Sequence, residues 1–165
     1  AQFELGLAYA HGDGVKQDYG EAVAWYTRAA QQGLATAQCT LGVCYFEGKG
    51  VKRDVVEALR WYKAAARHGN AGALYNIGRI YEEGELAKRN IIEAVKWYRD
   101  AARRGLAAAQ YRLGVCYAEG QGVLIDRTEA KRWLKRAAQQ NYPGAEKRHR
   151  ELTDAGETDT RTVAP

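Results

Sequence analysis

The stretch Ala37–Gly72, AQCTLGVCYFEGKGVKRDVVEALRWYKAAARHGNAG, decides the fold because it recurs along the whole chain. A shift of 36 residues superposes Tyr9, Tyr45, Tyr81 and Tyr117, and it also superposes the four tryptophans, Trp25, Trp61, Trp97 and Trp133. A fixed period of about 20 to 50 residues is typical of a solenoid, whose units bury their apolar faces only against one another. The sequence therefore predicts four repeats, at about 1–33, 34–69, 70–105 and 106–141.

Each repeat reads as a helix, a glycine-rich turn and a second helix. Leu41, Cys44 and Tyr45 lie at helical spacing and predict a first helix over about 35–47, which Gly48 and Gly50 then end. The start of the second helix carries an N-cap residue with glutamate three residues later. This pattern predicts a capping box, in which the two side chains bond each other's backbone amides. The four pairs are Asp18 and Glu21, Asp54 and Glu57, Asn90 and Glu93, and Asp126 and Glu129.

Glycines occupy two further registers of the repeat. Gly6, Gly42, Gly78 and Gly114 fall inside the first helix, where glycine costs about 1 kcal/mol relative to alanine. A cost that recurs in every unit predicts a helix crossing too close for a Cβ atom. Gly33, Gly69 and Gly105 follow the second helix and predict left-handed C-terminal caps, with Asn141 in that place in the last unit.

The pattern departs from its period in two places. In the third unit, Leu86 and Ala87 replace the Gly and Val of the other turns, which predicts a different path and an extended first helix. After Asn141, Pro143 opens a short charged helix, so 142–152 is predicted to cap the solenoid end. Residues 153–165 are polar and aperiodic, which predicts a flexible tail. We expect this tail to be held by the groove of the same molecule, by the groove of a neighbouring molecule, or by a lattice contact.

Bulk composition adds few constraints. The net charge is +5, and no apolar run approaches the roughly 20 residues of a membrane span. Ala1 aligns with Ala37, so the chain begins inside a repeat, and the compartment stays open between cytoplasm and periplasm. Cys39, Cys44 and Cys116 are an odd number without bridging geometry, which predicts free, mostly buried thiols.

The recurring motifs Leu-Gly-x-x-Tyr, Gly-x-Gly-Val, Asp-x-x-Glu-Ala and Trp-Tyr-x-x-Ala-Ala-x-x-Gly resemble the Sel-one-like repeat family, relatives of the tetratricopeptide repeat. The resemblance covers about residues 1–141. It implies an all-α, right-handed α/α superhelix whose first helices line the concave side. It also implies an adaptor or scaffold role, as in bacterial signalling complexes, with a protein or peptide partner. A secreted branch that staples each repeat with two cysteines separated by seven residues is disfavoured, because no pair with that spacing is present.

Since Leu41, Cys44 and Tyr45 face the second helix, the opposite stripe of each first helix is free for a ligand. By resemblance to tetratricopeptide repeats, this stripe binds peptide, and Asn76 stands where related repeats hold a peptide backbone with an asparagine amide. Arg79 and Arg112 are candidates to pair with a ligand carboxylate. The groove stripe comprises Phe3, Leu7, His11, Cys39, Val43, Phe46, Glu47, Tyr75, Asn76, Arg79, Glu82, Tyr111, Arg112, Val115 and Glu119.

Three alternatives compete with a peptide groove. Tight curvature would bury the groove stripe between neighbouring helices and leave it a structural role, with the contact surface elsewhere, such as the convex second helices or the edge loops. The basic C-terminal end, with Lys131, Arg132, Lys135, Arg136 and Lys147, Arg148, Arg150, suits nucleic acid or an acidic partner instead. Catalysis is disfavoured, because the chain has no serine and His11, His68 and His149 are isolated. No metal or cofactor is expected.

Overall fold

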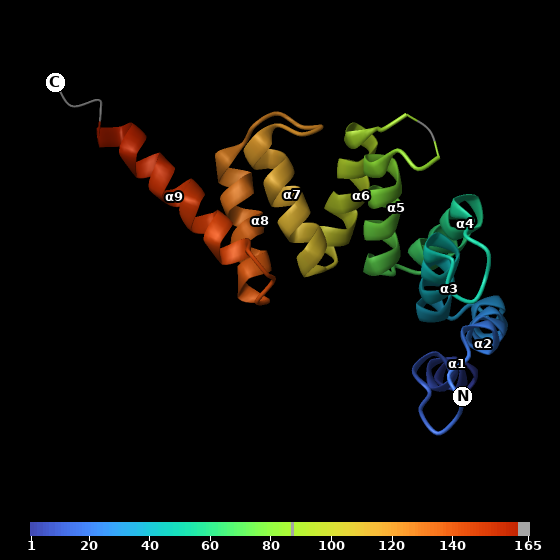
Figure 1. Cartoon of the computed structure of the whole chain (residues 1–165). Coiled ribbons are helices and arrows are strands. Elements are labelled where there is room, and N and C mark those ends of the chain that lie inside the picture. Colours follow the sequence, from blue (N-terminus) through green and yellow to red (C-terminus); the bar gives the residue numbers. More distant parts are fainter. Residues whose placement is uncertain (87, 162–165) are drawn as a thin grey trace.

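The computed structural model describes residues 1–86 and 88–161 (Figure 1). For residues 155–161 it describes the backbone alone. The described residues form helices and turns without a strand. The first helix of each repeat is here called the A helix and the second the B helix. They are α1 (Gln2–His11) and α2 (Tyr19–Gln31), α3 (Ala35–Glu47) and α4 (Val55–Arg67), α5 (Ala71–Glu83) and α6 (Ile91–Arg103), α7 (Ala107–Glu119) and α8 (Arg127–Gln139), followed by α9 (Ala145–Arg161).

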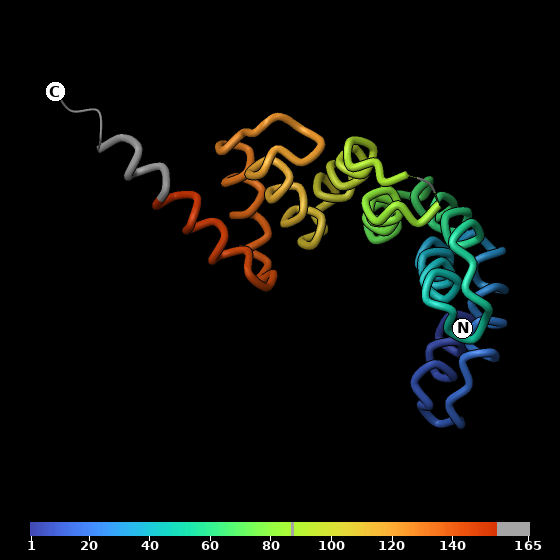
Figure 2. Tube along the Cα trace, turned by 45° about the horizontal axis from the view of Figure 1, so that its top comes forward, coloured from blue at the N-terminus to red at the C-terminus, as the bar shows by residue number. Residues whose placement is uncertain are grey.

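Each helix packs against the next one along the chain, and α3 also contacts α5. The buried clusters lie at the seams, where a B helix meets the A helix of the following repeat. One cluster joins Tyr26 of α2 to Leu41 of α3, and another joins Tyr62 of α4 to Ile77 of α5. The repeats therefore stabilise one another in sequence, and the stack bends as an arc between α1 and α8 (Figure 2). This architecture confirms the predicted helical solenoid.

The mid-helix glycines sit at close crossings within each repeat, as predicted. A Cβ atom on Gly6, Gly42 or Gly78 would lie 2.6–2.7 Å from a ring carbon of a B-helix tyrosine. At Gly114 the obstructing atom is Leu134 Cγ, at 2.7 Å. The helix-propensity cost of these glycines is offset by burial of a large side chain against bare backbone.

The helix starts confirm one half of the capping box and correct the other. The side chains of Asp18, Asp54, Asn90 and Asp126 each accept a bond from the backbone amide three residues later, at 2.9–3.1 Å. The glutamate side chains do not accept a hydrogen bond from the backbone amide of the cap residue. The cap residue's own amide instead donates to the carbonyl of the recurring tyrosine, as Asp54 N does to Tyr45 O at 2.9 Å. The glutamate is thereby left for cations, such as Arg60 beside Glu57.

The remaining turns follow the sequence with one exception. Gly33, Gly69, Gly105 and Asn141 all have positive φ, which confirms the left-handed caps. The expected extension of the third A helix is wrong. Helix α5 ends at Glu83 before a left-handed Gly84, at the same register as α3 and α7, because that glycine still ends the helix. The altered path at Ala87 itself lies outside the described residues.

Helix α9 corrects the expected boundary of the C-terminal cap. It continues past Leu152, the end expected from the sequence, to Arg161. Thr153 Oγ1 donates to the carbonyl of His149, and extending a helix costs far less than nucleating one. Helix α9 packs on α8, and residues 162–165 of the expected tail lie outside the described part. Within the described helices, none combines the length and apolarity needed to cross a bilayer.

Candidate functional site

The first half of the groove stripe is largely used in packing. Phe3 contacts the ring of Tyr26, with centroids 5.5 Å apart, and Leu7 packs on the same cluster. Cys39 and Val43 pack against the seam between α4 and α5. His11 and Glu47 are exposed, and Glu47 pairs with Lys49 at 2.7 Å. Here the alternative of a structural stripe describes most of the residues.

Phe46 begins the part of the stripe that remains accessible. It is half-buried, and the guanidinium groups of Arg53 and Arg79 lie 5.5 and 5.6 Å from its ring centroid. Arg79 also donates two hydrogen bonds to Glu83 Oε1, at 3.0 and 2.8 Å. Arg53 likewise pairs with Glu85 at 2.6 Å, so the two guanidinium groups fix the ring and their charges are compensated within the protein.

Tyr75 joins this surface to the next A helix. Its ring lies 5.4 Å from that of Tyr98, and burial is the main cause that raises the pKa of its hydroxyl. Tyr142 also raises the pKa of this hydroxyl, while the charges of Arg79 and Arg112 lower it.

An ion pair crosses from α5 to α7 at this point. Glu82 accepts a hydrogen bond from the Tyr98 hydroxyl at 2.6 Å and pairs with the guanidinium of Arg112. Arg112 also donates to Gln121 Oε1 at 2.9 Å. The sequence predicts that Arg79 and Arg112 pair with a ligand carboxylate. In the structure, both instead form ion pairs with carboxylates of the protein itself.

Asn76 differs from its charged neighbours. Its side chain is half-exposed, and within the described part of the chain its amide makes no hydrogen bond. Such an amide can donate to and accept from a peptide backbone at the same time.

A hollow of about 400 Å³ opens beside the last A helix. Tyr111, Val115 and Glu119 of the groove stripe line one wall, and Lys147, Arg148 and Glu151 of α9 line the other. Tyr142 stacks on Tyr111 with centroids 5.1 Å apart, and Arg148 pairs with Glu119. Val115 itself is buried, so the accessible surface comes from the polar residues and Tyr111.

Sequence reasoning missed the residues that frame the stripe from outside the A helices. Arg53 and Arg89 donate from Nε to the carbonyls of Phe46 and Glu82, both at 3.0 Å, and Gln17 bonds Ala10 O in the same register. That recurrence of long polar side chains in the turn is a signal the sequence does carry. Arg148 lies in the aperiodic C-terminal part, and Tyr142 falls at a register that holds leucine or asparagine in the other repeats, so neither residue carries a recurring signal.

The three cysteines fit the prediction of free thiols. Burial raises the pKa of Cys39 and of Cys44 to about 11, and it raises the pKa of Cys116 as well. A thiol with a raised pKa is a poor nucleophile at neutral pH, so these groups serve as small apolar side chains.

The family model described as Sel1 repeat matches residues 1–34, 35–70, 71–106 and 107–142, which is nearly the whole chain. The chain belongs to the Sel1 repeat family. In the last three repeats, the matched ranges begin one residue later than the ranges expected from the period. The match confirms the resemblance drawn from the motifs.

Solved structures of Sel1 repeat proteins are similar to this one. A protective antigen of uropathogenic Escherichia coli with this fold is 35% identical, with a TM-score of 0.88, over 94% of this chain and 33% of its own. The present chain thus spans a third of that protein. A Sel1 repeat protein from Oxalobacter formigenes is 33% identical, with a TM-score of 0.82, over 96% of this chain and 72% of its own.

Cysteine-rich protein B of Helicobacter pylori shares the fold, with 19% identity and a TM-score of 0.63 over 81% of this chain and 96% of its own. A search of curated proteins found no match. Membership of the Sel1 repeat family supports a repeat-based scaffold for protein interactions, and the family is typically non-catalytic. 

Proposed function

We propose that this Sel1 repeat protein is an adaptor that binds an extended peptide segment of a partner protein along the groove stripe. The observation that carries the proposal is the hollow between α7 and α9, which is lined by Tyr111, Val115 and Glu119 of that stripe. Pockets that accept a ligand combine apolar area with a few oriented polar groups, and this wall offers both.

The central part of the stripe extends the same surface toward α3. Phe46, Tyr75 and Tyr111 are half-buried aromatics on three successive A helices, and each is fixed by a ring or guanidinium contact. Side chains that are already immobilised lose little entropy when a ligand binds. The unbonded amide of Asn76 would hold the peptide backbone between these rings.

The internal ion pairs change the expected specificity. Because Arg79 and Arg112 are neutralised by Glu83 and Glu82, a ligand carboxylate would have to compete with them. The groove therefore favours a peptide with aromatic or aliphatic side chains over a strongly acidic one.

Comparative affinity capture tests this proposal. Immobilised wild-type protein is compared with a variant carrying Tyr75→Ala, Asn76→Ala and Tyr111→Ala, and captured proteins are quantified by mass spectrometry. Partners bound through the groove should fall by about tenfold or more in the variant, since contacts of the interface core are removed.

A matched control changes exposed residues outside the stripe, with Tyr19→Ala, Gln31→Ala and Gln139→Ala. This control should retain its partners. Circular dichroism confirms that both variants fold. Equal capture by all three proteins would show that binding does not use the groove.

A further inference from the structure

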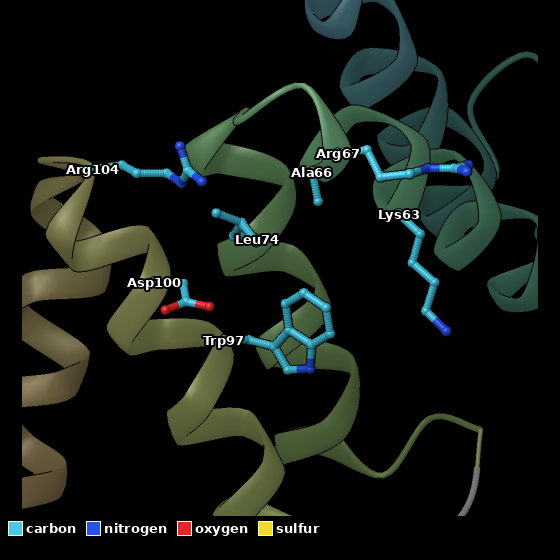
Figure 3. A pocket seen from close by; sticks show the side chains of 7 residues that line it. All are labelled: Lys63, Ala66, Arg67, Leu74, Trp97, Asp100 and Arg104. Carbon is cyan, nitrogen blue, oxygen red and sulfur yellow. The ribbon is translucent and has the colours of Figure 1, made fainter.

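Two hollows lie between successive B helices, away from the groove stripe. The first, of about 570 Å³, lies between α4 and α6 beside the start of α5, with Lys63 on one side of the Trp97 ring and Leu74 above the ring on the other side (Figure 3). The second, of about 230 Å³, lies between α6 and α8. The first is lined by Lys63, Ala66, Arg67, Leu74, Trp97, Asp100 and Arg104, and the second by Arg99, Arg103, Tyr117, Glu129, Arg132, Trp133 and Arg136.

These two cavities, called the B-helix hollows below, share part of their lining one repeat apart. A shift of 36 residues carries Lys63 to Arg99, Arg67 to Arg103 and Trp97 to Trp133. Each hollow thus has a tryptophan wall from one B helix and two cations from the B helix before it. A surface that recurs with the fold suits an extended ligand that runs along the stack.

The hollows are strongly basic. The lining of the first contains three cations, Lys63, Arg67 and Arg104, and one carboxylate, Asp100. The lining of the second contains four arginines and one carboxylate, Glu129. No carboxylate of the described residues forms an ion pair with Lys63, Arg67 or Arg104. In the second hollow, Glu129 pairs with Arg132 at 3.1 Å, while Arg136 lies over Trp133 at 4.9 Å.

Part of the lining of the first hollow is apolar. Ala66, Leu74 and Trp97 provide it, and Leu74 and Trp97 also belong to the core cluster between the third and fourth repeats. A volume of this size accepts a large apolar side chain, and cations at its rim suit carboxylates on either side of that residue.

The tryptophans favour a peptide over a nucleic acid. Trp133 is 6% exposed, and its indole N–H donates to Glu129 at 2.9 Å. Trp97 is half-buried, and its Nε1 atom is covered and makes no hydrogen bond in the described structure. Base recognition on single strands depends on exposed aromatic faces, which these rings do not offer.

We infer that the B-helix hollows bind an acidic segment of a partner protein. A large apolar side chain of that segment occupies the hollow between α4 and α6, and flanking carboxylates pair with Lys63, Arg67 and Arg104. The arginines of the second hollow extend the same basic track toward α8. This surface is separate from the groove stripe, so the two proposals stand or fall independently.

Fluorescence anisotropy with defined probes tests the inference at about 0.15 M salt, where exposed long-range charge is screened. The probe is a short fluorescein-labelled polyglutamate peptide with one central phenylalanine. A second peptide probe carries serine in place of the phenylalanine, and a labelled oligothymidylate represents nucleic acid. The hollow variant carries Lys63→Glu, Arg67→Glu and Arg104→Glu.

The control variant carries Lys16→Glu, Lys52→Glu and Lys88→Glu, three exposed turn lysines in one register, which change the net charge by the same amount. We expect the affinity of the hollow variant for the phenylalanine peptide to be at least about tenfold lower than that of wild type. The affinity of the control variant, called the turn variant below, should stay within about twofold of wild type. The serine peptide should bind wild type more weakly than the phenylalanine peptide.

Several results would overturn the inference. They are equal losses in the hollow and turn variants, equal binding of the two peptides, tighter binding of oligothymidylate than of peptide, or no peptide binding by wild type. If the charge reversals lower the melting temperature, Lys63→Gln, Arg67→Gln and Arg104→Gln are measured against the same criteria.

Discussion

At the scale of single residues, each mid-helix glycine leaves no room for a Cβ atom against a B-helix side chain. Gly78 faces Tyr98, whose side chain is fully buried and whose hydroxyl is held by Glu82. The ring therefore has no room to withdraw from an added Cβ atom. Burial also raises the pKa of this hydroxyl, which is consistent with its enclosed position.

Gly78→Ala should lower the free energy of unfolding by about 1–2 kcal/mol. Overpacking a core costs about 1–3 kcal/mol, while the better helix propensity of alanine returns up to about 1 kcal/mol. Urea unfolding followed by circular dichroism measures the difference. Gly20→Ala is the control, since a Cβ atom there meets only Asp18 Oδ1, at 3.2 Å. The control should be neutral or stabilising, and the same sign for both substitutions would contradict the explanation.

At the scale of the helix, the start of each B helix is fixed by one side chain and not by a reciprocal pair. Asp54 accepts from the amide of Glu57 at 3.0 Å, while its own amide donates to Tyr45 O. The tyrosine carbonyl therefore replaces the glutamate side chain as acceptor. This arrangement ties the B helix directly to the end of the A helix.

Two substitutions in α4 distinguish this arrangement from a complete capping box. Asp54→Ala should destabilise the protein by about 1 kcal/mol, because it leaves an amide of the first turn unpaired. Glu57→Gln should change stability by only a few tenths, since it loses only the exposed pair with Arg60. Both effects are measured by chemical denaturation. Comparable losses for the two variants would indicate that Glu57 also caps the helix in solution.

At the scale of the whole molecule, stability passes from one repeat to the next through the seams. Cooperative unfolding then depends on each seam, as expected for a one-dimensional stack. Ile77 is fully buried at the seam between α4 and α5, in the middle of the chain.

Ile77→Ala should cost about 2–5 kcal/mol and should weaken the coupling between the two halves of the stack. Unfolding curves from tryptophan fluorescence and from circular dichroism coincide for a two-state protein, and they should separate in this variant. Ile92→Ala, at a residue that is 62% exposed, is the matched control and should leave both curves unchanged. A single coincident transition for Ile77→Ala would argue against decoupling.

The sequence by itself determined the number of repeats, the helix starts and the left-handed caps, because these depend on local chemistry that recurs every 36 residues. Asn141 in the place of a capping glycine is an example, since its positive φ follows from its register alone. The motifs were also sufficient to indicate the family.

The tertiary structure decided which of the candidate residues are available. Cys39, Val43 and Val115 are used in packing, Arg79 and Arg112 are paired internally, and α9 supplies a wall that the period did not predict. The B-helix hollows likewise exist only between repeats. Their shapes depend on how neighbouring units are rotated against each other, and that rotation is set by many side chains packing across each seam rather than by any local pattern.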